Sequence, residues 1–379
     1  MENTMEIGMP RALLYYTYYP FWHGFFEGLG IKVILSDHTT KKTLSEGAGL
    51  VVSETCLPIK VYAGHILNLI EKGVKKIFVP SVQSIAPKIY NCSKIRGLPD
   101  IIRNVIKADF TMVEATYDKS EKHQGLYEFL KEAAAYFGIT DIDVIKKAAR
   151  NGQKVSNNFR LMTSMGVPYA KALKLALENK VVLPSEKKQF PITIAVIAHG
   201  YNLYDDRVSM RILDKLEAMN VGTKTAAELS DEQMKEGIAA MGSKLYWANE
   251  LEITGAASHY IQNQNVDGLI VINAFGCGPD SLMIERIARF AKDKGKAFLN
   301  LSIDEQTGEA GFITRIEAFT DMLFRRKKIK EKQEKILRQD RKDPAYSIGG
   351  SSRGAGHAVL FYYLPRAAAS ANNEFHHLP

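Results

Sequence analysis

The chain has 379 residues, of which 46% are hydrophobic and 24% are charged, and its formal net charge is +8. This apolar content excludes a globally disordered chain, and the length predicts two α/β domains rather than one. No apolar run is long enough to span a bilayer, no secretory signal is seen and no nucleic-acid-binding motif accompanies the positive charge. We therefore expect a cytoplasmic protein with neither membrane nor nucleic acid as its partner.

The first predicted domain, residues 1–117, alternates short β-branched runs with helical patterns, which is typical of a parallel, doubly wound sheet. Strands are expected at residues 5–9, 31–35, 76–79 and 108–113. Helices are expected at residues 13–29, 39–47, 59–70 and 99–107. Pro20 should kink or split the first helix, because proline cannot donate the backbone hydrogen bond that a helix interior requires.

Residues 118–190 change to helical spacing and predict a helical bridge, with helices at 126–137, 142–153 and 169–178. The second predicted domain is residues 191–340. Its expected strands are 193–200, 222–226, 266–273 and 296–303, and its expected helices are 206–219, 247–262, 281–291 and 312–339. The final residues, 341–379, are expected to be a flexible tail. The sequence therefore predicts an α/β protein with two doubly wound parallel sheets and a helical insert.

The chain contains only three cysteines, Cys56, Cys92 and Cys277, and each is expected in a turn that leads into a helix. Their odd number argues against a disulfide framework. Because the turns after parallel strands gather at one edge, we expect the three thiols to meet in a cleft between the domains. Three thiolates from separate elements suit a [4Fe-4S] cluster with one open iron, and a helix N-terminus favours the thiolate form of Cys277. The alternative is that each cysteine is a buried, uncharged core residue.

Other polar motifs allow two interpretations each. The turn D-E-Q-T-G-E-A-G, residues 304–311, either lies functionally beside the cysteines or caps the last helix. Ser53 and Glu54 either tune a site at Cys56 or cap the following helix. His199 either is a ligand or proton donor or has a structural role, and a histidine at the end of a strand more often has a structural role. The chain has no G-x-x-x-x-G-K-[ST] motif, so we do not expect it to hydrolyse ATP.

Several motifs together resemble one family, the acyl-CoA dehydratase activase-related proteins, within the superfamily of 2-hydroxyacyl-CoA dehydratase and benzoyl-CoA reductase subunits. The motifs are I-G-M-P-R-A-L-L-Y-Y (7–16), E-T-C-L-P-I-K (54–60), G-H-I (64–66), F-V-P-S (78–81), G-L-P-D (97–100), G-Y-N-L-Y-D (200–205) and D-E-Q-T-G-E-A-G-F-I-T-R-I-E-A-F (304–319). The resemblance covers residues 1–325.

This resemblance implies two flavodoxin-like domains with helical additions, and an iron–sulfur cluster held by Cys56, Cys92 and Cys277. It implies an oxygen-sensitive protein of the 2-hydroxyacyl-CoA dehydratase type, which transfers low-potential electrons to a CoA thioester. The implied partners are a second copy or a partner subunit, and a separate ATP-dependent reductase or activator. Two alternatives stay open: a non-enzymatic cluster or electron carrier that serves a partner enzyme, and a metal-free α/β binding protein with three buried thiols.

Overall fold

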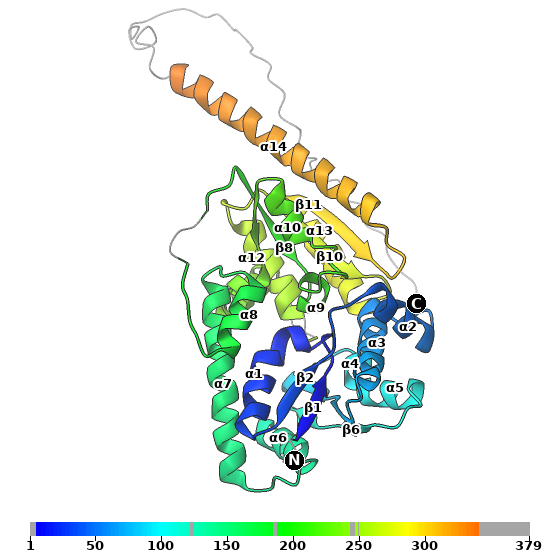
Figure 1. Ribbon diagram of the computed structural model, residues 1–379. Coiled ribbons are helices and arrows are strands. Elements are labelled where there is room, and N and C mark those ends of the chain that lie inside the picture. The colour runs from blue at the N-terminus through cyan, green and yellow to red at the C-terminus, as the bar shows by residue number, and fades with distance from the viewer. Residues whose placement is uncertain (1–4, 122–124, 185–187, 243–246, 249, 341–379) are drawn as a thin grey trace, which may run out of the picture. The chain divides into compact units, whose positions relative to one another are not determined.

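The computed structural model describes residues 5–121, 125–184, 188–242, 247–248 and 250–340. Residues Met1–Lys328 form one compact unit, in which two four-stranded sheets and one three-stranded sheet are flanked by helices in the described part of the chain (Figure 1). The second unit is Ile329–Pro379, and its described residues, 329–340, are helical. The α/β class, the two parallel sheets and the helical insert that the sequence predicts are confirmed.

The N-terminal sheet has the strand order β2-β1-β3-β6, and all of its pairs are parallel. Its strands are β1 Glu6–Met9, β2 Lys32–Leu35, β3 Lys76–Phe78 and β6 Thr111–Val113. Alternate residues of these strands pack in two separate hydrophobic cores, because successive side chains of a strand point to opposite faces of the sheet. Ile7 and Phe78 pack in the core that contains α1 (Tyr15–Gly28), whereas Ile77 packs with α3 (Leu57–Glu71). The other helices of this part are α2 Lys41–Leu50, α4 Ser93–Arg96 and α5 Leu98–Val105.

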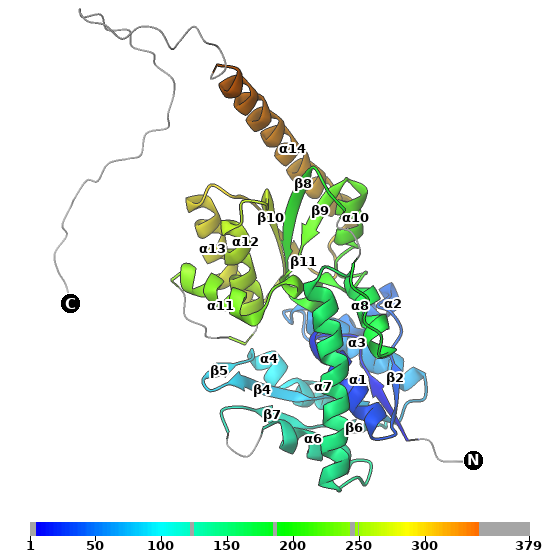
Figure 2. The same ribbon diagram turned by 90° about the vertical axis from the view of Figure 1, so that its left-hand side faces the viewer.

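A small three-stranded sheet was not predicted from the sequence. It has the order β5-β4-β7, with strands β4 Ser81–Ala86, β5 Ile89–Tyr90 and β7 Thr116–Asp118 (Figure 2). Strand β4 pairs in parallel with β7 and antiparallel with β5. Strands of two or three residues are too short to show an alternating pattern, so they leave no reliable signal in the sequence.

The helical insert consists of α6 Leu126–Ala135, α7 Ile142–Ser164 and α8 Tyr169–Leu177. Helix α7 packs closely along α1, and glycines make this approach possible. A Cβ atom on Gly24 would lie 2.9 Å from the Cα atom of Gly152, so neither position has room for a side chain. Pro20 lies inside α1, which is one continuous helix rather than two, so the predicted split does not occur.

The C-terminal sheet has the order β11-β10-β8-β9 and is parallel throughout. Its strands are β8 Ile192–Ile197, β9 Val221–Lys224, β10 Gly268–Ala274 and β11 Ala297–Ile303. Strand β10 is buried along its whole length, as its largely apolar sequence predicts. The helices of this part are α9 Gly200–Leu203, α10 Ile212–Ala218, α11 Asp231–Ala240, α12 Ala256–Gln262, α13 Gly278–Asp293 and α14 Glu309–Asp340. A 3₁₀ turn, Ala226–Glu228, and a π-helical turn, Leu251–Gly255, complete the set.

Helix α10 is shorter than the predicted helix at 206–219, and α11 was not predicted. The predicted domain boundaries stay predictions, and the predicted tail, 341–379, lies outside the described residues. Among the described residues, no helix combines the length and apolar composition that a membrane span needs.

Candidate functional site

Each of the three cysteines is the N-cap residue of a helix, as the sequence predicts for the turns around them. Cys56 precedes α3, Cys92 precedes α4 and Cys277 precedes α13. Pro58 and Pro279 lie in the first turns of α3 and α13, where proline's missing N–H costs no helical hydrogen bond. The three thiols therefore occupy equivalent positions on three different helices.

The turns that carry these cysteines face one another within the compact unit. The charge of a Cys92 thiolate raises the pKa of Cys56, and a Cys56 thiolate raises the pKa of Cys277. A Cβ atom on Gly276 would lie 3.4 Å from the backbone oxygen of Glu54, so the turns before α3 and α13 touch. The fold thus brings together residues that are far apart in the sequence.

Cys56 and Cys277 are protonated at neutral pH. Burial raises the pKa of Cys56, and the Lys94 charge offsets this only in part. Burial, followed by the nearby Asp280 carboxylate, raises the pKa of Cys277 well above its usual range. The expected thiolate at the helix N-terminus is therefore not favoured, because desolvation of a partly buried thiol outweighs the helix dipole.

The described residues do not fit a metal centre. No group of three or more His, Cys, Asp or Glu side chains among them is arranged to hold a metal ion. Cys56, Cys92 and Cys277 are each partly buried free cysteines.

His199 carries a buried positive charge beside the cysteine turns. Its Nε2 lies 2.8 Å from Oδ1 of Asp280, and its Nδ1 lies 3.4 Å from Oε2 of Glu252. Burial by itself would lower the pKa of His199, but the carboxylates of Asp280 and Glu252 raise it to about 10. Tyr201 packs against the imidazole with a centroid separation of 5.0 Å. His199 is thus the satisfied structural histidine that its position after a strand favoured.

The turn at residues 304–311 makes contacts within itself and with a distant segment, and its predicted roles stay predictions. Asp304 accepts hydrogen bonds from the Gln306 N–H and the Thr307 hydroxyl, which stabilises the turn before α14. Glu305 instead reaches across the unit, where its Oε1 lies 2.5 Å from Nζ of the buried Lys60. The same ammonium donates to the backbone oxygen of Ser53, 2.9 Å away, so it anchors the turn before Cys56.

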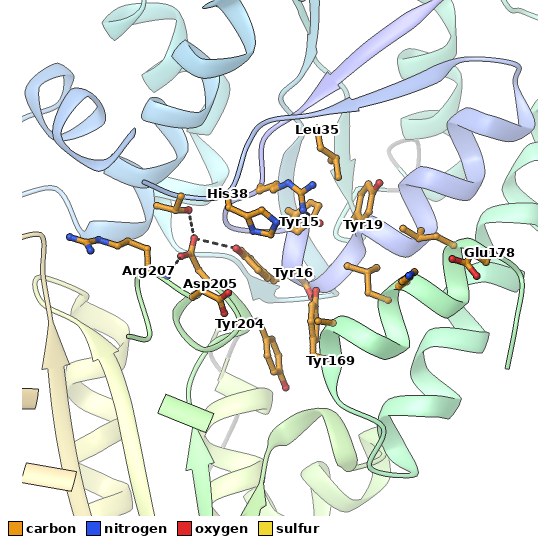
Figure 3. A pocket seen from close by; sticks show the side chains of 17 residues that line it. Tyr15, Tyr16, Tyr19, Leu35, His38, Tyr169, Glu178, Tyr204, Asp205 and Arg207 are labelled. Carbon is orange, nitrogen blue, oxygen red and sulfur yellow. Dashed lines mark hydrogen bonds between the residues drawn. The ribbon is translucent and has the colours of Figure 1, made fainter. Parts of the chain in front are cut away.

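A cavity of about 450 Å³ lies beside the carboxyl ends of β1 and β2 (Figure 3). Its lining residues come from four segments: Arg11, Tyr15, Tyr16 and Tyr19; Leu35, His38 and Thr39; Tyr169, Ala170, Leu173, Lys174, Leu177 and Glu178; and Tyr204, Asp205, Asp206 and Arg207. Cavities of about 300–1,000 Å³ are typical of small-molecule sites.

Asp205 anchors a hydrogen-bonded chain at one end of this cavity. Its carboxylate accepts from the hydroxyls of Thr39 and Tyr16, and from the Arg207 N–H at 2.9 Å (Figure 3). Because Thr39 donates to Asp205, the Nε2–H of His65 donates to Thr39, 2.9 Å away. Burial raises the pKa of Asp205 and lowers that of His65 to about 3, so the imidazole is neutral.

Sequence reasoning did not single out Asp205, Thr39, Tyr16 or Lys60. Asp205 and Thr39 follow strands of different sheets, so a search for polar residues after each strand would have found both. Tyr16 falls within the helix expected at residues 13–29, and helical spacing alone does not indicate the contact that its hydroxyl makes. The pairing of Lys60 with Glu305 leaves no local signal, because 245 residues separate them.

The model of the CoA enzyme activase uncharacterised domain matches residues 6–229, which is more than half of the chain. This segment includes β1 to β9 and every residue that lines the cavity. No curated protein matches the sequence.

This match corrects the function predicted from the sequence. The prediction of an iron–sulfur protein of the 2-hydroxyacyl-CoA dehydratase type is wrong. The characterisation of the chain as a [4Fe-4S] protein is wrong for the same reason. The matching family is that of an activase rather than a dehydratase subunit, and the described residues contain no group arranged to hold a metal. The assignment of Cys56, Cys92 and Cys277 as cofactor-binding residues stays a prediction. The chain belongs to the family of the CoA enzyme activase uncharacterised domain.

Proposed function

We propose that the chain is an activator protein, which binds an enzyme acting on a CoA thioester and raises that enzyme's activity. The single observation that carries this proposal is the match of residues 6–229 to the CoA enzyme activase domain. Because an activase acts on another enzyme, the family description supports interaction with a partner enzyme. We further propose that the substrate of this partner enzyme is an acyl-CoA.

An exposed apolar surface beside the cysteine turns supports docking of a partner. We call it the turn surface, and it consists of Val52, Phe275 and Leu282, whose side chains are 71%, 69% and 71% exposed. Val52 lies just before the Cys56 turn, and the other two flank Cys277. Large apolar side chains grouped on a surface are typical of protein-binding sites, and aromatic residues are enriched among those that contribute most affinity.

Buried charges hold the turn surface in place. The Lys60–Glu305 ion pair fixes the turn before α3, and the His199–Asp280 contact fixes the first turn of α13. Both turns are therefore supported from beneath by contacts between distant segments. A preorganised surface favours binding because less conformational entropy is lost when the partner docks.

Reconstitution tests the proposal. A purified 2-hydroxyacyl-CoA dehydratase would be assayed for turnover of its acyl-CoA with and without the chain, and complex formation would be followed by analytical ultracentrifugation. We expect a complex and a faster turnover. A Phe275→Ser variant should lose both, whereas Leu161→Ser should keep both, because Leu161 is a similarly apolar, 48% exposed side chain on α7. The absence of both complex and activation with the unmodified chain would reject the proposal.

A further inference from the structure

Helix α14 carries most of the chain's excess positive charge in one stretch. Residues 325–338, which we call the basic segment, contain eight lysines and arginines and two glutamates, so their formal net charge is +6. The whole chain has a formal net charge of +8, and all other residues together therefore contribute only +2. A charge concentrated in this way attracts a surface of opposite sign and speeds association with it.

Helix α14 is packed along its first turns and exposed along its last turns. Phe312, Ile316 and Leu323 lie in a hydrophobic core, and the ammonium of Lys327 donates to the backbone oxygen of Pro191. From residue 328 on, every side chain of α14 that the structure describes is exposed. Helices in proteins gain most of their stability from packing, so a partner that packed against these turns would stabilise them further.

Two apolar side chains share one face of the basic segment. A helix has about 3.6 residues per turn, so Ile329 and Ile336, which are two turns apart, lie one above the other. Their side chains are 58% and 47% exposed. Arg325 and Lys332 lie next to them by the same spacing, and both are exposed. We call this side of the segment the isoleucine face.

The carboxylates of the basic segment avoid the isoleucine face. Glu331 and Glu334 follow Ile329 at spacings that place them on the opposite side of the helix. The isoleucine face therefore presents apolar groups bordered by cations, without an intervening carboxylate. This pattern is typical of a helix that docks in an apolar groove with an acidic rim.

Three other occupants fit the isoleucine face less well. A second copy of the chain would bring two segments of like charge together, which is unfavourable. A nucleic acid would engage the cations through its phosphates but would offer no apolar groove to the isoleucines. A lipid surface favours a helix whose apolar side carries Trp, Phe or Leu, and residues 325–338 contain no aromatic side chain.

We propose that the isoleucine face docks in an apolar groove, bordered by Asp and Glu side chains, on the enzyme that the chain activates. This inference rests on the proposed function and adds a contact that does not involve the turn surface. Ile329 and Ile336 fill the groove, and Arg325 and Lys332 pair with carboxylates at its rim. Because the rim pairs are exposed, salt screens them, whereas it leaves the apolar contact in place.

Binding of the full chain to a purified 2-hydroxyacyl-CoA dehydratase tests this inference, followed by surface plasmon resonance at about 0.05 M and about 0.5 M NaCl. We expect faster association and tighter binding at the lower salt concentration. Arg325→Glu should weaken binding there by about 10-fold, and its matched control Arg338→Glu, an exposed arginine on the opposite side of the helix, by less than about 3-fold. Ile336→Ala should weaken binding by about 10-fold at both salt concentrations and keeps the helix, since alanine is a good helix former.

The outcomes separate this inference from the proposed function. If Arg325→Glu and Ile336→Ala bind like the unmodified chain while Phe275→Ser still loses activation, this inference is overturned and the activator role stands. Equal weakening by Arg325→Glu and Arg338→Glu, without an effect of Ile336→Ala, would show attraction by charge alone and overturn it as well. Tighter binding of the chain to double-stranded DNA than to the dehydratase would identify a nucleic acid as the occupant instead. No binding of the unmodified chain to the dehydratase would reject both proposals.

Discussion

Lys60 and Glu305 form an ion pair with an Nζ–Oε1 distance of 2.5 Å, although 245 residues separate them in the chain. The Lys60 side chain is 4% exposed, and it also donates to the backbone oxygen of Ser53. This contact joins the first turn of α3 to the turn before α14. It is one of the buried charge contacts on which the shape of the turn surface depends.

Loss of one partner of this pair should destabilise the fold. Glu305→Gln leaves the Lys60 ammonium buried without its counter-charge, which costs about 3 kcal/mol in comparable pairs. We expect a lower free energy of unfolding in urea denaturation. Lys42→Met is the control, because Lys42 pairs with Glu71 on the surface and both are half exposed or more. It should leave the stability unchanged. Equal stability of Glu305→Gln and the unmodified chain would contradict the role of this pair.

The charge on His199 predicts how stability depends on pH. The carboxylates of Asp280 and Glu252 raise its pKa in the folded protein to about 10, from 6.5 in the unfolded chain. The folded state therefore retains the proton at a pH where the unfolded state has lost it. The stabilisation is fully present below pH 6.5 and is lost as the pH rises towards 10.

Urea denaturation at a series of pH values between 6 and 10 measures this effect. The unmodified chain should lose stability across the window, and a His199→Gln variant should be less stable at low pH and show a flatter profile. Identical slopes in the two proteins would show that His199 is not the titrating group.

The cysteine thiols should react slowly with alkylating agents. Burial raises the pKa of both Cys56 and Cys277, and only the thiolate form attacks such reagents. With iodoacetamide at neutral pH, mass spectrometry should show slower modification of these two residues in the folded chain than in urea. Modification of the folded chain as fast as of the unfolded chain would contradict their protonated, partly buried state.

The contact between α1 and α7 depends on its glycines. An alanine at Gly24 would place its Cβ 2.9 Å from the Gly152 Cα, so the helices must separate. Overpacking of this kind costs about 1–3 kcal/mol. Gly49 in α2 is the control, because a Cβ atom there meets nothing within 4 Å. Gly49→Ala should stabilise slightly through helix propensity. If both variants unfold at the same urea concentration, the two helices do not pack this closely.

The main strands could be predicted because their residues carry a strong local signal. The apolar run at β10 and the β-branched run at β2 indicate strands without any tertiary information. The cysteine turns were also predictable, since Pro58 and Pro279 mark the starts of the helices that follow. These signals depend only on neighbouring residues.

The chemistry of the sites could not be predicted in the same way. The pKa of Cys277 depends on burial and on Asp280, and burial outweighed the helix dipole that the sequence suggested. The His199 charge depends on Glu252, which is 53 residues away. The resemblance to activase-related proteins agrees with the matched activase domain, whereas its extension to the 2-hydroxyacyl-CoA dehydratase type led to the wrong function.

The most direct test of the activator role is a titration of the chain into a fixed amount of a 2-hydroxyacyl-CoA dehydratase, with acyl-CoA conversion as the readout. We predict that the rate rises to a plateau, and that Phe275→Ser abolishes the rise while Leu161→Ser retains it. A rate independent of the concentration of the chain would contradict the account.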